Sequence, residues 1–247
     1  MKTLIRMIAA VSVLVFAVGP AFAAEPLSEA RKKHIETIIE DYILANPEII
    51  TKAIEVLQAR QRAAEKRGTR AAVVANRSKL FFDPTSPVGG NTNGDVTLVE
   101  FFDYRCGVCK RVHPIVAKLV ADDRKIRRVY KEWPILGPES RLAARAALAS
   151  RKQGKYFVFH NAMMEARGRL DRAAVMRIAK RVGLDATRLA RDMKDPGIES
   201  VLRRNFALAE ALKLTGTPSF VIEDTLLRGG RDLATMQKLV ADARAKK

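Results

Sequence analysis

The two cysteines of the chain lie in one short motif, Cys106-Gly107-Val108-Cys109. A pair with this spacing closes a loop too small to stabilise a fold much, so the motif favours chemistry over structural bridging. Thiol–disulfide exchange and the binding of zinc or copper are the candidate chemistries, because each of them uses thiolates. Gly107 and Val108 offer neither a charge nor a side-chain donor to the pair.

The neighbouring sequence predicts where this pair lies. The apolar segment 96–102 predicts a buried strand, and residues 107–123 predict a helix that begins directly after Cys106. A helix N-terminus stabilises a thiolate through its free N–H groups and its dipole, so we expect the pKa of Cys106 to be lowered. Cys109 follows one helical turn later, close enough to resolve a mixed disulfide.

Acidic, basic and histidine residues lie near the motif in the sequence. Glu100 lies within the apolar strand, where a buried carboxylate is costly, and we predict that it relays protons near the thiols. The alternative is a structural ion pair with Lys131 on the next strand, and both could hold together. Arg105 and Lys110 add positive charge nearby. His113 could be a metal ligand or a general base, but we interpret it as an exposed helix position.

The N-terminus predicts export. Lys2 and Arg6 precede an apolar stretch over 7–18, and Ala21-Phe22-Ala23 fits a signal-peptidase site. We therefore predict a signal peptide over residues 1–23. The apolar stretch is shorter than the ~20 residues of a membrane-spanning helix. Export to the periplasm places the single cysteine pair in an oxidising compartment, which favours thiol exchange.

The composition is strongly basic, with 45 Lys and Arg against 27 Asp and Glu and a net charge of +18. Such a balance can indicate nucleic acid or an anionic membrane as a partner. Here the basic residues are spread over many predicted helices with few aromatic residues between them. We interpret them as a solvated surface and expect no nucleic-acid partner.

Residues 24–79 predict a helical segment without strands. Apolar residues recur at helical spacing over 35–42 and again over 50–57, with a helix break at Asn46-Pro47. Two helices with an apolar stripe and no sheet cannot bury that stripe well alone. They dock on their own domain or form an oligomerisation arm, and the pattern alone does not decide between the two.

The rest of the chain predicts an α/β domain over residues 80–247. Residues 83–94 are rich in Pro, Gly and Asn and predict a loop. A second strand over 126–133 completes a β-α-β unit, helices follow over about 138–213, and a short hairpin over 219–228 precedes a closing helix. The order predicts a β-α-β half and a β-β-α half separated by a helical insertion.

Three stretches resemble the DsbA family of thioredoxin-fold oxidoreductases: VTLVEFFDYRCGVCK, VYKEWPILGPES and TGTPSFVI. The resemblance implies a thioredoxin fold with an inserted helical domain, preceded by the N-terminal helical arm. It implies that Cys106 is the nucleophile, that Cys109 resolves, and that Glu100 is the strand acid of the family. It also implies that Thr217 and a cis Pro218 bind the substrate backbone.

The segment 35–58 resembles the N-terminal arm of a DsbA-like subgroup that includes the suppressor-of-copper-sensitivity C proteins and related trimeric isomerases. This resemblance implies a homo-oligomer formed through the arm. We expect exported proteins as substrates, a membrane-bound redox partner, no metal, and no cofactor other than the redox-active Cys106–Cys109 disulfide.

One departure from the family bears on the direction of the reaction. Strongly oxidising members carry Pro-His between the cysteines, whereas this chain has Gly107-Val108. We therefore expect a less acidic Cys106 and a less oxidising disulfide, which favours an isomerase or reductase. The alternatives are a DsbA-like dithiol oxidase, a copper(I)-binding or copper-tolerance protein and, more remotely, a holdase chaperone.

Overall fold

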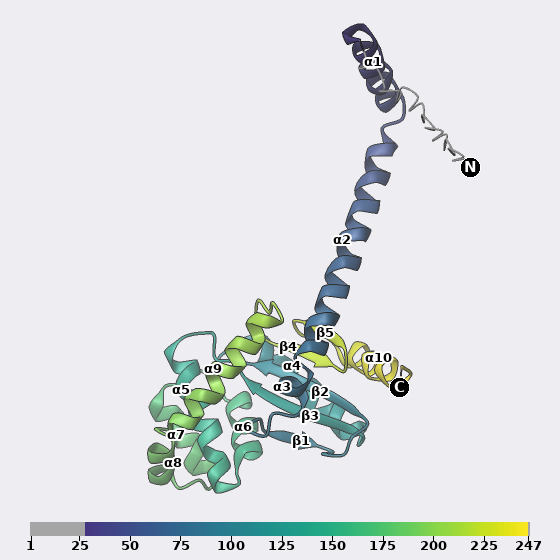
Figure 1. Ribbon diagram of the computed structural model, residues 1–247. Helices are drawn as coiled ribbons and strands as arrows, with labels where there is room; N and C mark the ends of the chain where they lie inside the picture. Colours follow the sequence, from purple (N-terminus) through teal and green to yellow (C-terminus); the bar gives the residue numbers. More distant parts are fainter. Residues whose placement is uncertain (1–27, 247) are drawn as a thin grey trace, which may run out of the picture. The chain divides into compact units, whose positions relative to one another are not determined.

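The computed structural model describes residues 28–246, which form two compact units that meet in sequence between Ala59 and Arg60 (Figure 1). The predicted signal peptide lies outside the described residues. Within the described part of the chain, no helix is long and apolar enough to span a membrane.

The first unit is helical, as the sequence predicts. Helix α1 (Glu29–Ala45) begins after Ser28, whose hydroxyl accepts a hydrogen bond from the backbone N–H of Arg31. It ends at Asn46, and α2 (Glu48–Ala75) starts after Pro47 and continues into the second unit. The apolar residues at helical spacing are exposed on these helices; they are Ile35, Ile38, Ile39, Tyr42, Ile50, Ile54 and Leu57.

The second unit is built on a five-stranded sheet with the strand order β1-β3-β2-β4-β5. The strands are β1 (Val88–Gly90), β2 (Val96–Phe102), β3 (Ile126–Glu132), β4 (Ser219–Ile222) and β5 (Thr225–Arg228). Strands β2 and β3 are parallel and are connected by α4 (Gly107–Asp122), while β4 runs antiparallel to β2 and β5 antiparallel to β4. This arrangement confirms the predicted β-α-β and β-β-α halves of a thioredoxin fold.

Strand β1 corrects the prediction of a continuous loop over 83–94. It pairs antiparallel with β3, with Val88 opposite Val129 and Gly90 opposite Arg127. Glycine has little intrinsic preference for strands, so the pairing is set by the tertiary contact with β3. A Cβ atom at Gly90, where φ is +67°, would lie 2.5 Å from the carbonyl oxygen of Ile126, so the close approach requires glycine.

Helices cover both faces of the sheet. On one face, α4 and α10 (Leu233–Arg244) pack on β2 and β4 through a core that includes Val116 and Phe220. On the other face, α3 (Arg77–Phe81) and α9 (Pro196–Ala211) pack through a core that includes Phe101 and Leu208.

The helical insertion runs from Pro138 to Ala211, close to the predicted range of about 138–213. Its elements are α5 (Pro138–Ser150), the 3₁₀ turn η1 (Arg151–Gln153), α6 (Tyr156–Glu165), α7 (Arg172–Arg181), α8 (Ala186–Asp192) and α9. The carboxylates of Asp171 and Asp185 accept backbone N–H groups at the starts of α7 and α8. The apolar core of the insertion includes both cysteines, so the insertion helps to position them.

Candidate active site

Cys106 is the N-cap residue of α4. Its backbone is extended, and its Sγ accepts the backbone N–H of Cys109 at 3.2 Å, as the oxygen of a serine or aspartate cap would. The side chain is 7% exposed, so the sulfur lies at the edge of the core. The prediction that a helix begins directly after Cys106 is confirmed, and strand β2 ends shortly before it at Phe102.

The two cysteines, which are both free thiols in this structure, have opposite acidities. The hydrogen bond from the Cys109 thiol lowers the pKa of Cys106, burial opposes it, and the Thr217 side chain and the backbone N–H groups of Cys109 and Val108 lower it further, to about 5. The same hydrogen bond and burial raise the pKa of Cys109. Cys106 is therefore ionised at neutral pH while Cys109 keeps its proton, and the role of Cys106 as the nucleophile stays a prediction.

The loop before β4 faces the Cys106 sulfur. The Thr217–Pro218 peptide bond is cis, as expected. In its thiol form, Cys106 donates to the carbonyl oxygen of Thr217 at 3.2 Å, and Ser219 Oγ donates to the carbonyl oxygen of Gly216 at 2.7 Å. An extended peptide that paired with this loop would bring its own sulfur next to Cys106; the substrate-binding role of Thr217 and Pro218 stays a prediction.

Glu100 is buried behind the cysteines, but its partner differs from the alternative that the sequence suggested. Its carboxylate forms an ion pair with Arg128 at 2.5 Å, and Lys131 forms one with Asp83 at 3.3 Å. Glu100 and Lys131 lie on opposite faces of the sheet, because Lys131 is opposite Phe101 in the register and shares its face. The negative charge of Glu100 raises the pKa of Cys109, which places the carboxylate within electrostatic reach of that thiol.

His113 is buried, which contradicts the interpretation as an exposed helix position. The helix α4 is covered on this side by the insertion, and the His113 and His160 rings lie 5.4 Å apart. Burial, followed by the charges of Arg128 and Lys110, lowers the pKa of His113 to about 4, so the imidazole is neutral at pH 7. The position was misjudged because a single helix pattern does not show which second layer will cover it.

The two cations next to the motif are both engaged by the insertion. Lys110 Nζ donates to the carbonyl oxygens of Met163 at 2.8 Å and Ala166 at 2.7 Å, at the end of α6. Arg105 donates to the carbonyl oxygen of Leu136 and pairs with Glu139 at 3.3 Å. Lys110 and Arg105 therefore connect the helical insertion to the loop and the first helical turn that contain the cysteines.

Sequence reasoning missed a buried polar cluster beside the site. The hydroxyl groups of Tyr104 and Tyr156 lie 2.9 and 2.8 Å from Glu132 Oε1, and Tyr104 also contacts Nδ1 of His160 at 2.9 Å. Burial is the largest cause that raises the pKa of Glu132. Glu132 shares its face of β3 with Ile126 and Tyr130, but Tyr156 comes from the insertion and Tyr104 from the loop between β2 and α4, so the sequence could not match them to it.

The fold and the site together define a class of protein: a thioredoxin fold with a dithiol at a helix N-terminus, facing a cis-proline loop. Residues 97–241 match the DSBA-like thioredoxin domain, and residues 32–64 match the copper resistance protein ScsC N-terminal domain. The chain therefore belongs to the family of DSBA-like thioredoxin domains.

Solved structures support this assignment. A thioredoxin-like oxidoreductase from Silicibacter pomeroyi DSS-3 is 50% identical, with a TM-score of 0.68 over 69% of this chain and 98% of that one. A linker-deletion mutant of Proteus mirabilis ScsC is 26% identical, with a TM-score of 0.69 over 92% of this chain and 100% of that one.

The curated relatives include proteins of other lengths. The chain is 26% identical to Na(+)/H(+) antiporter NhaA 3 of Salinispora tropica over 76% of its own length, but it spans only 30% of that relative. Because most of that relative lies outside the match, its name gives no activity to this chain. The probable disulfide bond formation protein D of Bacillus cereus is 24% identical, over 70% of this chain and 88% of that protein.

Proposed function

We propose that the protein is a periplasmic thiol–disulfide oxidoreductase that acts on exported proteins as a disulfide isomerase or reductase. The observation that carries the proposal is the Cys106 sulfur: it caps α4, has a pKa lowered to about 5, and faces the Thr217–Pro218 loop. The relatives described as thiol oxidoreductases support the same chemistry. The expectation that Gly107 and Val108 make the disulfide less oxidising supports isomerisation over oxidation.

The geometry supports a two-step exchange. The Cys106 thiolate attacks a substrate disulfide, which forms a Cys106–substrate bond and releases a substrate thiolate. In isomerisation, another substrate thiolate attacks the adduct and regenerates the Cys106 thiolate, with no net oxidation. In reduction, Cys109 loses its proton and attacks Cys106 Sγ, which releases the reduced substrate and leaves the Cys106–Cys109 disulfide. We propose that Glu100 takes up the Cys109 proton.

Recovery of an enzyme with scrambled disulfides, in a glutathione redox buffer, tests this function. We expect recovery well above the buffer rate for the wild-type protein and none for Cys106→Ser, because serine cannot form the adduct. Cys109→Ser should retain part of the recovery but accumulate mixed disulfides with substrate. Efficient oxidation of a reduced substrate without any recovery of the scrambled one would instead establish the dithiol oxidase.

We also propose that the first unit joins copies of the chain. Its helices expose the apolar residues of α1 and the start of α2, and a match to the ScsC N-terminal domain covers residues 32–64. Joined subunits would place several Cys106 thiolates around one substrate.

An isomerase also needs a reductant, and we expect a membrane-bound redox partner that keeps the pair reduced.

The same match favours copper(I) binding as a second candidate function. Two thiolates are suitable soft ligands for Cu(I). Among the described residues, no group of three or more His, Cys, Asp or Glu side chains is placed to hold a metal, so the pair itself would be the site. Titration of the reduced protein with Cu(I) should give tight stoichiometric uptake that Cys106→Ser abolishes if this function holds.

A further inference from the structure

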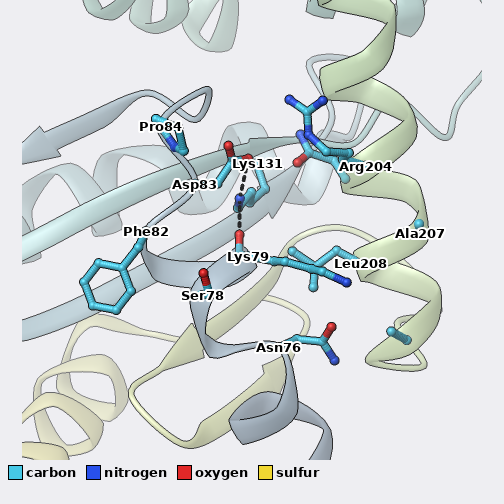
Figure 2. Close-up of a pocket in the computed structure, with 12 residues that line it drawn as sticks. Asn76, Ser78, Lys79, Phe82, Asp83, Pro84, Lys131, Arg204, Ala207 and Leu208 are labelled. Carbon is cyan, nitrogen blue, oxygen red and sulfur yellow. Dashed lines mark hydrogen bonds and ion pairs between the residues drawn. The ribbon is translucent and has the colours of Figure 1, made fainter.

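A pocket of about 290 Å³ lies on the face of the sheet opposite α4, within the second unit (Figure 2). Its walls come from α3, the loop that follows α3, β3 and α9. Its volume is close to the lower end of the roughly 300–1,000 Å³ of small-molecule sites. None of the cysteine-site residues lines it, so any ligand bound here would be distinct from the substrate of the redox site.

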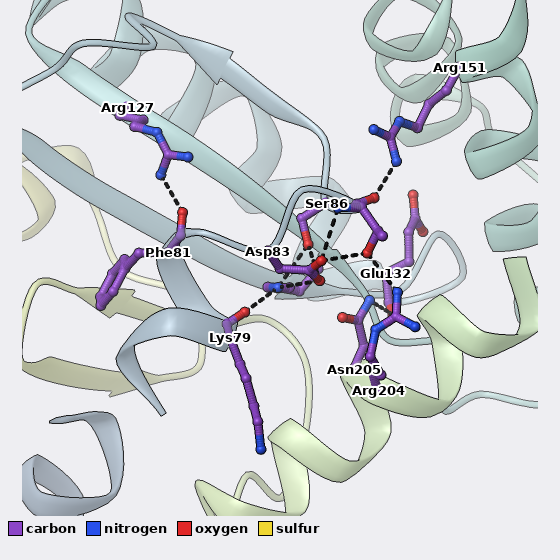
Figure 3. A network of polar contacts seen from close by, with 11 residues as sticks. Lys79, Phe81, Asp83, Ser86, Arg127, Glu132, Arg151, Arg204 and Asn205 are labelled. Atoms are coloured by element: carbon purple, nitrogen blue, oxygen red, sulfur yellow. Dashed lines mark hydrogen bonds and ion pairs between the residues drawn. The ribbon is translucent and has the colours of Figure 1, made fainter. Parts of the chain in front are cut away.

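The floor of the pocket holds a neutralised ion pair. Lys131 is fully buried, and its ammonium group bonds the carboxylate of Asp83 at 3.3 Å, the hydroxyl of Ser86 at 2.8 Å and the carbonyl oxygen of Lys79 at 2.7 Å. Figure 3 shows this network around Asp83. The three protons of Lys131 are thereby used, so this lysine positions the loop and leaves ligand binding to its neighbours.

Two further cations lie at the pocket, and they are not neutralised. Lys79 and Arg204 both line it (Figure 2). Arg204 donates to the hydroxyl of Thr85 at 2.8 Å. Among residues 28–246, no carboxylate forms an ion pair with Lys79 or Arg204. The rim of the pocket therefore carries positive charge available for an anion.

A buried acceptor without a donor lies in the same pocket. Asn205 is 1% exposed, and its Nδ2 donates to the carbonyl oxygen of Glu132 at 3.0 Å. Its Oδ1 is buried and accepts no hydrogen bond from the described residues. In Figure 3 this oxygen points away from Glu132, toward the Asp83 loop. A buried acceptor left unpaired is costly, so its position favours a ligand with an N–H or O–H donor.

The remaining wall is apolar. Ala207 and Leu208 of α9 lie on one side and Pro84 lies across from them, while the Phe82 ring points away from α9 (Figure 2). Ala211 of α9 also lines the pocket. A ligand that contacts the cationic rim, the unpaired oxygen of Asn205 and the apolar wall needs an anionic group, a hydrogen-bond donor and an apolar body.

We propose that this pocket binds an N-acylated amino acid with an apolar side chain, the chemical group that also forms the C-terminal end of a peptide. The carboxylate would lie between Lys79 and Arg204, the amide N–H would donate to Asn205 Oδ1, and the side chain would pack on Leu208. The inference does not depend on the redox activity, because it uses other residues on the other face of the sheet.

Ligand-observed NMR titration of the purified protein with N-acetyl-L-leucine tests the proposal. We expect saturable binding, and weaker binding of N-acetyl-L-leucinamide, which lacks the carboxylate, and of 4-methylpentanoate, which lacks the N–H. A tetrapeptide that ends in leucine distinguishes the sources: binding as tight as that of N-acetyl-L-leucine assigns a peptide end, and its failure to bind assigns a free acylated amino acid.

Variants with matched controls localise the binding. Lys79→Gln and Arg204→Gln should each weaken binding about two- to fivefold, since exposed charge pairs contribute modestly. Arg203→Gln, on the neighbouring position of α9 and outside the pocket, and Cys106→Ser should bind as the wild type does, with folding checked by circular dichroism. The absence of saturable binding, an equal loss in Arg203→Gln, or a loss in Cys106→Ser would overturn the proposal.

Discussion

The acidity of Cys106 depends on a few named donors, and these make its titration predictable. Because the pKa of Cys106 is lowered to about 5, the thiolate fraction rises with pH through that value and is nearly complete at pH 7. We expect the rate of alkylation by iodoacetamide in the reduced protein to rise with a midpoint near pH 5 and to level off above about pH 6.5. A midpoint near 8 or 9 would contradict the geometry.

Replacement of the strongest donor should move this titration. Cys109→Ala removes the thiol that donates to the Cys106 thiolate, so the midpoint of alkylation should rise by about one to two pH units. Val108→Ala is the matched control, because it retains the backbone N–H of that residue, and its midpoint should stay within a few tenths of a unit of the wild type. An unchanged midpoint in Cys109→Ala would show that the backbone donors alone set the acidity.

Glu100 makes a separate prediction, because its charge raises the pKa of Cys109. In Glu100→Gln that charge is gone, so the pKa of Cys109 should fall while the step that removes its proton becomes slower at neutral pH. The measurement is the pH profile of mixed-disulfide resolution. Lys131→Met breaks the ion pair on the opposite face and should cost stability without a change in this profile. Identical profiles for Glu100→Gln and the wild type would exclude the proton-relay role.

At the scale of elements, the structure indicates that Lys110 stabilises the packing of α4 against α6. Its ammonium group donates to carbonyl oxygens at the C-terminal end of α6, where helix carbonyls lack partners. Lys110→Met should lower the free energy of unfolding by about 1–3 kcal/mol, measured by urea denaturation. Lys118→Met, which removes an exposed pair on the same helix, should change it by less than about 0.5 kcal/mol. Equal effects of the two variants would refute the stabilising role of Lys110.

The elements that carry the site could be predicted because their signals are local. An apolar run followed by Cys106 and a helical pattern defines β2 and α4, and Ser28 and Asn46 mark the ends of α1. Contacts between distant elements could not be predicted. Strand β1 exists only by pairing with β3, and His113 is buried only because the insertion covers α4.

The partner of Glu100 was missed for a related reason. Lys131 and Arg128 both lie on the strand beside Glu100, and composition does not distinguish them. The choice depends on register, because a shift of one residue moves a side chain to the other face.

At the scale of the whole molecule, we predict that copies of the chain assemble through the exposed apolar residues of α1 and the start of α2. Ile38→Glu places a charge within the α1 stripe and should reduce the mass measured by sedimentation equilibrium to that of one chain. Thr37→Glu adds the same charge on the opposite side of α1 and should leave the mass unchanged. If both variants keep the wild-type mass, the stripe is not the interface.

The loss of assembly should also separate two activities. Isomerisation is expected to fall in Ile38→Glu, because one substrate would then meet one thiolate at a time and the local concentration of thiolates around it would drop. Alkylation of Cys106 should be unaffected, since its donors all lie in the second unit.

The position of Cys106 as the cap of its own helix links folding to redox chemistry. A thermodynamic cycle connects the two. The difference in unfolding free energy between the reduced and oxidised proteins is proportional to the difference in reduction potential of the cysteine pair between the folded and unfolded chains. The thiolate contributes to the stability of the reduced form in full above pH 9, and this contribution is lost as the pH falls toward 5. Through this term the folded pair becomes a stronger oxidant as the pH rises, relative to the same pair in the unfolded chain.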